Sequence, residues 1–166
     1  MQWQVLDSYE TENVLLLNKD QKLNNKDFTL LFLDRLRELS PKLAEIFRQN
    51  LNQLDRQSRW LSGVDLGPVD DSLHFVLPKG CSLKQAAIQL SGAYLFNADI
   101  WDQLSDLEKN ILISHELLYR SILQYSTLED SRPVRALNGL LISTEFSKMT
   151  TDKRQDFLKA HQIELP

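Results

Sequence analysis

Residues 105–125 read SDLEKNILISHELLYRSILQY, the longest stretch of the chain with a clear helical period. Ser105, followed three residues later by Glu108, matches the capping box with which many helices begin. At about 100° per residue, His115 and Tyr119 fall on the apolar side of this helix, and Glu116 lies at its border. The apolar stripe itself consists of Leu107, Ile111, Leu118 and Ile122. The stretch therefore predicts a central helix that carries polar side chains toward the core.

The composition is that of an ordinary globular protein. The chain has 166 residues, of which 42% are hydrophobic and 25% charged, with a formal net charge of −4. This length suits one domain, residues 1–166, with one core. An acidic chain lacks the basic surface on which nucleic-acid binding depends. No apolar run approaches the ~18 residues needed to span a bilayer, and the N-terminal sequence MQWQVLDSYE has no signal-peptide pattern. We expect one domain with neither a nucleic-acid partner nor a membrane span.

The rest of the chain predicts an α+β fold, with a helical N-terminal half, a small antiparallel sheet, and C-terminal helices around the central one. Apolar residues at helical spacing indicate two helices that meet at Ser40–Pro41 and two more after the central helix. Ser91–Gly92 is a plausible hairpin turn between two strands. The further helices are expected at residues 27–39, 41–56, 131–141 and 150–161. The strands are expected at residues 72–78, 84–90 and 93–97.

The N-terminal residues show no helical period. Two short apolar runs, residues 3–6 and 14–17, flank the polar residues 7–13. We interpret these runs as a weak hairpin or as extended arms. Residues 18–26, NKDQKLNNK, contain several turn formers and are expected to be a polar connector.

Residues 93–120 have the sequence AYLFNADIWDQLSDLEKNILISHELLYR. This run predicts a strand, then a helical turn, and then a long helix with His-Glu in its middle. This order resembles the strand and active helix of the zincin metallopeptidases. Their motif is H-E-x-x-H, in which two His residues bind zinc and the Glu activates water. The resemblance implies His115 as a metal ligand and Glu116 as a general base. Tyr119 replaces the second ligand, and a neutral phenol binds zinc poorly near pH 7. The carboxylates nearby in the sequence that are candidates for a third ligand are Glu129, Asp130 and Glu145.

A second resemblance runs from about residue 15 to residue 143. The pattern LPKGC, a Gln, IW..L, HE..YR and DSR.VR resembles an uncharacterised bacterial family from predatory and related deltaproteobacteria, whose members are often exported. This resemblance implies a shared fold and suggests an exported or periplasmic location, but it implies no reaction. The matching residues are Leu77, Pro78, Cys81, Gln85, Trp101, Leu104, His115, Glu116, Tyr119, Arg120, Asp130, Ser131, Val134 and Arg135.

Each candidate residue also has a structural interpretation. His115 is a metal ligand or, more commonly, a buried His that is hydrogen-bonded to a carboxylate such as that of Asp130. Glu116 is a general base or the partner of an arginine, of which Arg120, Arg132 and Arg135 are near in sequence. Asp130 and Ser131 are expected to cap the helix that follows them.

The single cysteine, Cys81, cannot form an internal disulfide. It is a buried small hydrophobe or a nucleophile paired with His115 or His74. No family motif surrounds it, which favours the hydrophobe.

We therefore expect one internal polar network made of His115, Glu116, Tyr119, Arg120, Asp130, Ser131 and Arg135. Our first hypothesis is a non-catalytic, zincin-like domain (a pseudo-metallopeptidase) without a cofactor, which binds or scaffolds a protein or peptide. The alternative is a metal-dependent hydrolase with zinc on His115, Glu116 as the base and Tyr119 as a donor to the oxyanion. A third possibility, an immunity or inhibitor protein, is compatible with the acidic charge.

Overall fold

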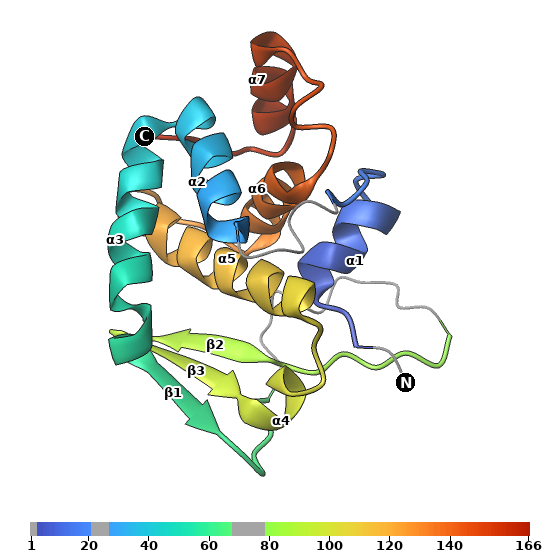
Figure 1. Ribbon diagram of the computed structural model, residues 1–166, viewed down its shortest axis with the longest axis vertical. Helices are drawn as coiled ribbons and strands as arrows, with labels where there is room; N and C mark the ends of the chain where they lie inside the picture. The colour runs from blue at the N-terminus through green and yellow to red at the C-terminus, as the bar shows by residue number, and fades with distance from the viewer. Residues whose placement is uncertain (1–2, 21–26, 68–78) are drawn as a thin grey trace.

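The structure, a computed structural model, describes residues 3–20, 27–67 and 79–166. This part of the chain contains helices and one small sheet, which confirms the α+β class (Figure 1). The expected strand at residues 72–78 lies outside the described residues, and so does His74. The elements in chain order are α1 Leu6–Asn13, α2 Phe28–Leu39, α3 Pro41–Gln57, β1 Ser58–Leu61, β2 Ala87–Leu90, β3 Ala93–Asn97, α4 Ala98–Trp101, α5 Asp106–Ile122, α6 Arg132–Ile142 and α7 Thr151–Ala160.

The expected central helix is α5, which lies between the sheet and the other helices (Figure 1). The Ser105 hydroxyl accepts a hydrogen bond from the Glu108 backbone N–H, as the capping box predicts. The Glu108 side chain does not complete that box. Its carboxylate accepts from the Val5 N–H (2.8 Å) and the Ser8 hydroxyl (2.7 Å) at the N-terminus of α1. A negative charge is favourable there because the helix dipole is positive at that end. Glu108 thus ties the start of α5 to the start of α1.

The N-terminal residues form a helix, α1, so the expected hairpin or extended arms are wrong. The reason is that the buried face of α1 is polar, and no apolar stripe marks it in the sequence. That face consists of Asp7, Ser8, Glu10 and Thr11. Gly139 of α6 permits the close approach of α1. A Cβ at this position would lie 2.8 Å from both Leu15 Cδ1 and Thr11 Oγ1.

The sheet has the strand order β1-β3-β2. β2 and β3 are antiparallel around the predicted turn, in which Gly92 adopts a positive φ of 77°. β1 runs parallel to β3, so the sheet is mixed rather than purely antiparallel. β1 begins immediately after α3. Its neighbouring residues Arg59 and Trp60 are both exposed, so the strand lacks the alternation of buried and exposed side chains that would mark it in the sequence. Trp60 nevertheless stacks on Phe96, its neighbour in the register, at 4.8 Å between ring centroids.

The remaining helices follow the sequence pattern closely. Ser40 caps α3 by accepting from the Leu43 N–H, and Pro41 occupies the first turn. Thr150 caps α7 in the same way. All the buried apolar residues of the described chain except Leu17 belong to one cluster, to which both the helices and the sheet contribute. None of the described helices has the length and apolarity needed to cross a membrane.

Candidate functional site

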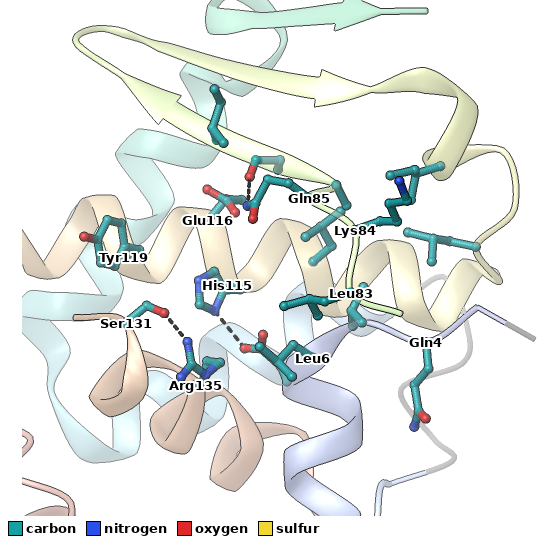
Figure 2. Close-up of a pocket in the computed structure, with 18 of the residues that line it drawn as sticks. Gln4, Leu6, Leu83, Lys84, Gln85, His115, Glu116, Tyr119, Ser131 and Arg135 are labelled. Atoms are coloured by element: carbon teal, nitrogen blue, oxygen red, sulfur yellow. Dashed lines mark hydrogen bonds and ion pairs between the residues drawn. The ribbon is translucent and has the colours of Figure 1, made fainter. Parts of the chain in front are cut away.

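A cavity of about 350 Å³ lies beside α5, bounded by α1, α6 and the segment that leads into β2 (Figure 2). Its walls come from segments that are far apart in the sequence. α5 contributes Leu112, His115, Glu116 and Tyr119. The other contributions are residues 3–7, residues 82–89, Ile100, Leu104, residues 129–131 and Arg135. The polar residues of the central helix therefore face a space and are not wholly enclosed by the core.

His115 is the polar centre of one side of this cavity. Its Nδ1 lies 2.8 Å from Asp7 Oδ1, and its side chain is 13% exposed. Figure 2 shows the imidazole pointing from α5 toward α1 and α6. The sequence predicts a His bonded to a carboxylate, and this is confirmed, but the carboxylate is that of Asp7 in α1 and not that of Asp130.

The pair is held in its charged form. Burial alone lowers the pKa of His115, but the negative charge of Asp7 and the hydrogen bond to it outweigh burial and raise the pKa to about 9. Burial raises the pKa of Asp7, yet the charge of His115 and hydrogen bonds from His115 and Asn138 lower it overall. At neutral pH His115 is therefore an imidazolium that donates through Nδ1 to Asp7. Its Nε2–H is a second donor and makes no hydrogen bond within the described residues.

Further side chains fix this pair in place. Asn138 Nδ2 donates to Asp7 Oδ1 (2.8 Å), and Asn138 Oδ1 accepts from the Ser114 hydroxyl (2.8 Å). Arg135 donates to Glu10 Oε2 (2.7 Å) and to the Ser131 hydroxyl. The two pairs, His115–Asp7 and Arg135–Glu10, thus join α1 to both α5 and α6. Because all these groups are buried or nearly so and bonded to one another, the network holds the imidazole of His115 in one orientation.

Glu116 leaves α5 in a different direction, toward β2 (Figure 2). Gln89 Nε2 donates both to its Oε2 (2.8 Å) and to its backbone carbonyl (2.6 Å). Gln89 Oε1 accepts in turn from Arg120 Nε (3.4 Å). Gln89 therefore stands between the carboxylate and Arg120, the arginine nearest to it along the helix. Burial raises the pKa of Glu116, although the charge of His115 and the Gln89 hydrogen bond oppose this shift.

The residues expected to form one network divide into two groups on different sides of α5. His115, Ser131 and Arg135 belong to the α1 side, and Glu116 and Arg120 belong to the β2 side. This separation follows from the turn of about 100° between neighbouring helical positions.

The other sequence candidates lie outside both groups or at their edge. Tyr119 lies beside His115, with ring centroids 6.3 Å apart and an interplanar angle of 7°. The Asp130 carboxylate accepts a hydrogen bond from the Arg132 backbone N–H (2.8 Å) and forms an ion pair with the Arg132 guanidinium. Ser131 is the N-cap residue of α6, but its side chain makes no capping hydrogen bond. Cys81 is exposed, so the expected buried hydrophobe is wrong.

Four residues of the site were missed by sequence analysis, namely Asp7, Glu10, Gln89 and Asn138. The polar residues 7–13 separate the two apolar runs that are expected to form a weak hairpin or extended arms. The signal that was available is the spacing of Asp7, Glu10 and Thr11, which places three polar residues on one helical face. Buried polar residues at helical spacing indicate a polar partner surface, which here is supplied by His115 and Arg135.

The candidate zinc ligands do not form one cluster among the described residues. No group of three or more His, Cys, Asp or Glu side chains within them is placed to hold a metal ion. Glu145, a candidate third ligand, instead accepts hydrogen bonds from the Asn18 backbone (3.0 Å) and side-chain amide (3.1 Å). Tyr119 offers a phenol where a second imidazole would be needed.

No protein-family model, curated protein or solved structure matches the chain.

Proposed function

We propose that this protein is a non-catalytic binding domain with a zincin-like strand and helix, and that the cavity beside α5 is its ligand site. The observation that carries the proposal is the cavity itself, with His115 and Glu116 in its walls. Its volume of about 350 Å³ falls within the range of small-molecule sites, roughly 300–1,000 Å³. A peptide side chain or terminus, or a small molecule, is therefore a suitable ligand.

The polar groups of the cavity favour recognition over chemistry. His115 is protonated at neutral pH because of Asp7, so it donates hydrogen bonds and does not accept a proton. Arg135 is held by Glu10, and the Ser131 hydroxyl accepts from Arg135. A few polar groups fixed among apolar walls, both donors and acceptors, are the usual means by which a binding site orients its ligand.

A hydrolase that uses Glu116 as its general base is the alternative, and the raised pKa of this carboxylate favours it. The two functions make different demands on Glu116. A hydrolase loses turnover when Glu116 is replaced by Gln, whereas a binding domain has no turnover to lose. Hydrolysis of a peptide library by the purified protein, abolished in Glu116→Gln, would overturn the binding proposal.

The direct experiment is a fragment screen on the full chain, followed by the shifts of backbone amide resonances. Ligands of the cavity should shift resonances from residues 3–7, 82–89 and 112–119. Leu83→Trp, at a cavity residue that is 38% exposed, should weaken this binding about tenfold or more by occupying the site. Leu123→Trp is the matched control, because Leu123 is 44% exposed and does not line the cavity. Fragments that bind both variants equally, or that never shift the cavity resonances, would contradict the proposal.

A further inference from the structure

Most charges around the cavity already have a partner of opposite sign. Each is either buried with that partner or paired with it at the surface. The four pairs are His115–Asp7 at 2.8 Å, Arg135–Glu10 at 2.7 Å, Arg132–Asp130 at 2.5 Å and Lys84–Asp65 at 3.5 Å. These pairs contribute little net charge to the cavity, so its preference depends on the groups that remain.

Glu116 is the buried group that remains. It is 7% exposed, and its carboxylate receives a hydrogen bond only from the neutral amide of Gln89 among the described side chains. Arg120 does not form an ion pair with it. The Arg120 guanidinium donates to Gln89 Oε1, to Gln57 Oε1 (2.5 Å) and to the Ala93 carbonyl (2.9 Å), and it stacks on the Tyr94 ring at 3.7 Å.

From this geometry we infer that the ligand presents a primary ammonium group to Glu116 and an apolar body to the cavity walls. The inference rests on the proposed function and names the chemical class of its ligand. An ammonium supplies both a direct ion-pair partner, which Glu116 lacks among the described residues, and up to three hydrogen-bond donors. A carboxylate or phosphate ligand would instead place a second negative charge beside a buried one. Glu129, exposed at the same cavity, adds to the negative potential.

The walls account for the apolar body. The apolar side chains that line the cavity together with Glu116 include Trp3, Ile88, Ile100, Leu104 and Leu112. Leu104 and Leu112 are buried, and the other three are partly buried. A fully solvated cation would leave these walls in contact with water. An alkyl or aryl amine would bury its apolar part against these walls while its ammonium group pairs with the Glu116 carboxylate.

Two sources offer this chemistry, a small free amine and the N-terminus of a peptide that begins with an apolar residue. Calorimetric titration of the full chain should compare 3-phenylpropylamine, 3-phenylpropanol and 3-phenylpropionate, which differ only in the polar end group. The peptides Leu-Gly-Gly and N-acetyl-Leu-Gly-Gly separate the second source from the first. We expect the amine to bind about tenfold or more tightly than the alcohol, which is the order of a charge-assisted hydrogen bond. Preference for Leu-Gly-Gly over both its acetylated form and the amine would identify the peptide terminus as the source.

Glu116→Gln tests the counter-ion directly. It should weaken amine binding about tenfold or more and remove most of the preference for the amine over the alcohol, because Gln keeps the shape and an acceptor for Gln89 but not the charge. A cooperative thermal unfolding transition shows that the variant is folded. Glu116→Asp should keep part of the preference for the amine. Glu164→Gln is the matched control, because it removes the same negative charge at an exposed residue that does not line the cavity, and it should leave amine binding unchanged.

Three results would overturn the inference. One is equal affinity for the amine and the alcohol, the second is tighter binding of the carboxylate, and the third is an unchanged amine affinity in Glu116→Gln. Each of these leaves the proposed function standing if the fragment screen still places ligands in the cavity. If that screen finds cavity ligands and all of them are neutral or anionic, the inference also fails. If neither experiment detects a cavity ligand, both proposals fail together.

Discussion

Asp7 Oδ1 and His115 Nδ1 lie 2.8 Å apart although their residues are separated by 108 positions in the sequence. The contact joins the first helix of the chain to the middle of its central helix. It also leaves only Nε2 of His115 available to the cavity. The Asp7–His115 pair therefore both secures α1 and fixes the orientation of the imidazole, since a carboxylate on one ring nitrogen determines what the other can do.

Asp7→Asn should lower the pKa of His115 from about 9 toward its ordinary value of 6.5. The amide oxygen of Asn can still accept the hydrogen bond, but the largest charge that favours the imidazolium is lost, so burial is then opposed mainly by the charge of Glu116. The chain contains three His residues, so an NMR titration of their ring protons can resolve His115. Asp130→Asn is the control, because Asp130 pairs with Arg132. An unchanged pKa in Asp7→Asn would show that Asp7 is not the cause of the shift.

The same pair predicts how stability depends on pH. The folded pKa of His115 is raised above 6.5, so its stabilising contribution is fully present below about pH 6.5 and is lost as the pH rises through about 9. The free energy of unfolding should therefore fall by at most about 3 kcal/mol between pH 6.5 and pH 9.5. Urea unfolding at several pH values measures it. His115→Gln should flatten the curve in this window, and an identical slope in this variant would assign the loss to other groups.

Gly139→Ala should destabilise the protein, although Ala favours helix over Gly by about 1 kcal/mol. The new Cβ would lie 2.8 Å from Leu15 Cδ1 and Thr11 Oγ1, which is closer than real contacts allow. Such overpacking costs roughly 1–3 kcal/mol. The double variant Gly139→Ala/Thr11→Ala should recover part of the loss, as thermal unfolding would reveal. A stabilised Gly139→Ala would show that α1 does not pack on α6 at this distance.

Tyr119→His should create zinc affinity that exceeds that of the parent protein. The rings at positions 115 and 119 already lie side by side, with centroids 6.3 Å apart. The Asp7 contact at Nδ1 leaves Nε2 of His115 free for a metal, which is the arrangement of many zinc-binding His residues. Affinity should fall as the pH is lowered, because zinc must displace a proton from each imidazole.

Calorimetric titration with zinc compares the variant with its parent. Tyr119→His/His115→Ala is the control and should lose the gained affinity. A folded Tyr119→His variant that binds no better than the parent would mean that the two side chains do not converge. The likeness to the metallopeptidase helix would then be one of letters only.

The sequence by itself determined the elements whose signal is local. The period of residues 105–125 and the Ser105 cap predict α5, and Ser40–Pro41 predicts the break between α2 and α3. The Ser91–Gly92 turn likewise predicts the β2–β3 hairpin. In each case the deciding interactions are formed within a few residues, so they can be read along the chain. The same helical period places positions 115, 116 and 119 on one helix, which the structure shows as α5.

Only the tertiary structure decided how the site is assembled. Asp7 and Glu10 are polar residues in a short helix without an apolar stripe, and their role depends on His115 and Arg135 more than 100 residues away. The placement of Gln89 between Glu116 and Arg120 likewise depends on how β2 packs beside α5. The parallel pairing of β1 with β3 has the same origin. Sequence periodicity records which face of an element is apolar, but a face that buries charges is recognised only when its partners are in place.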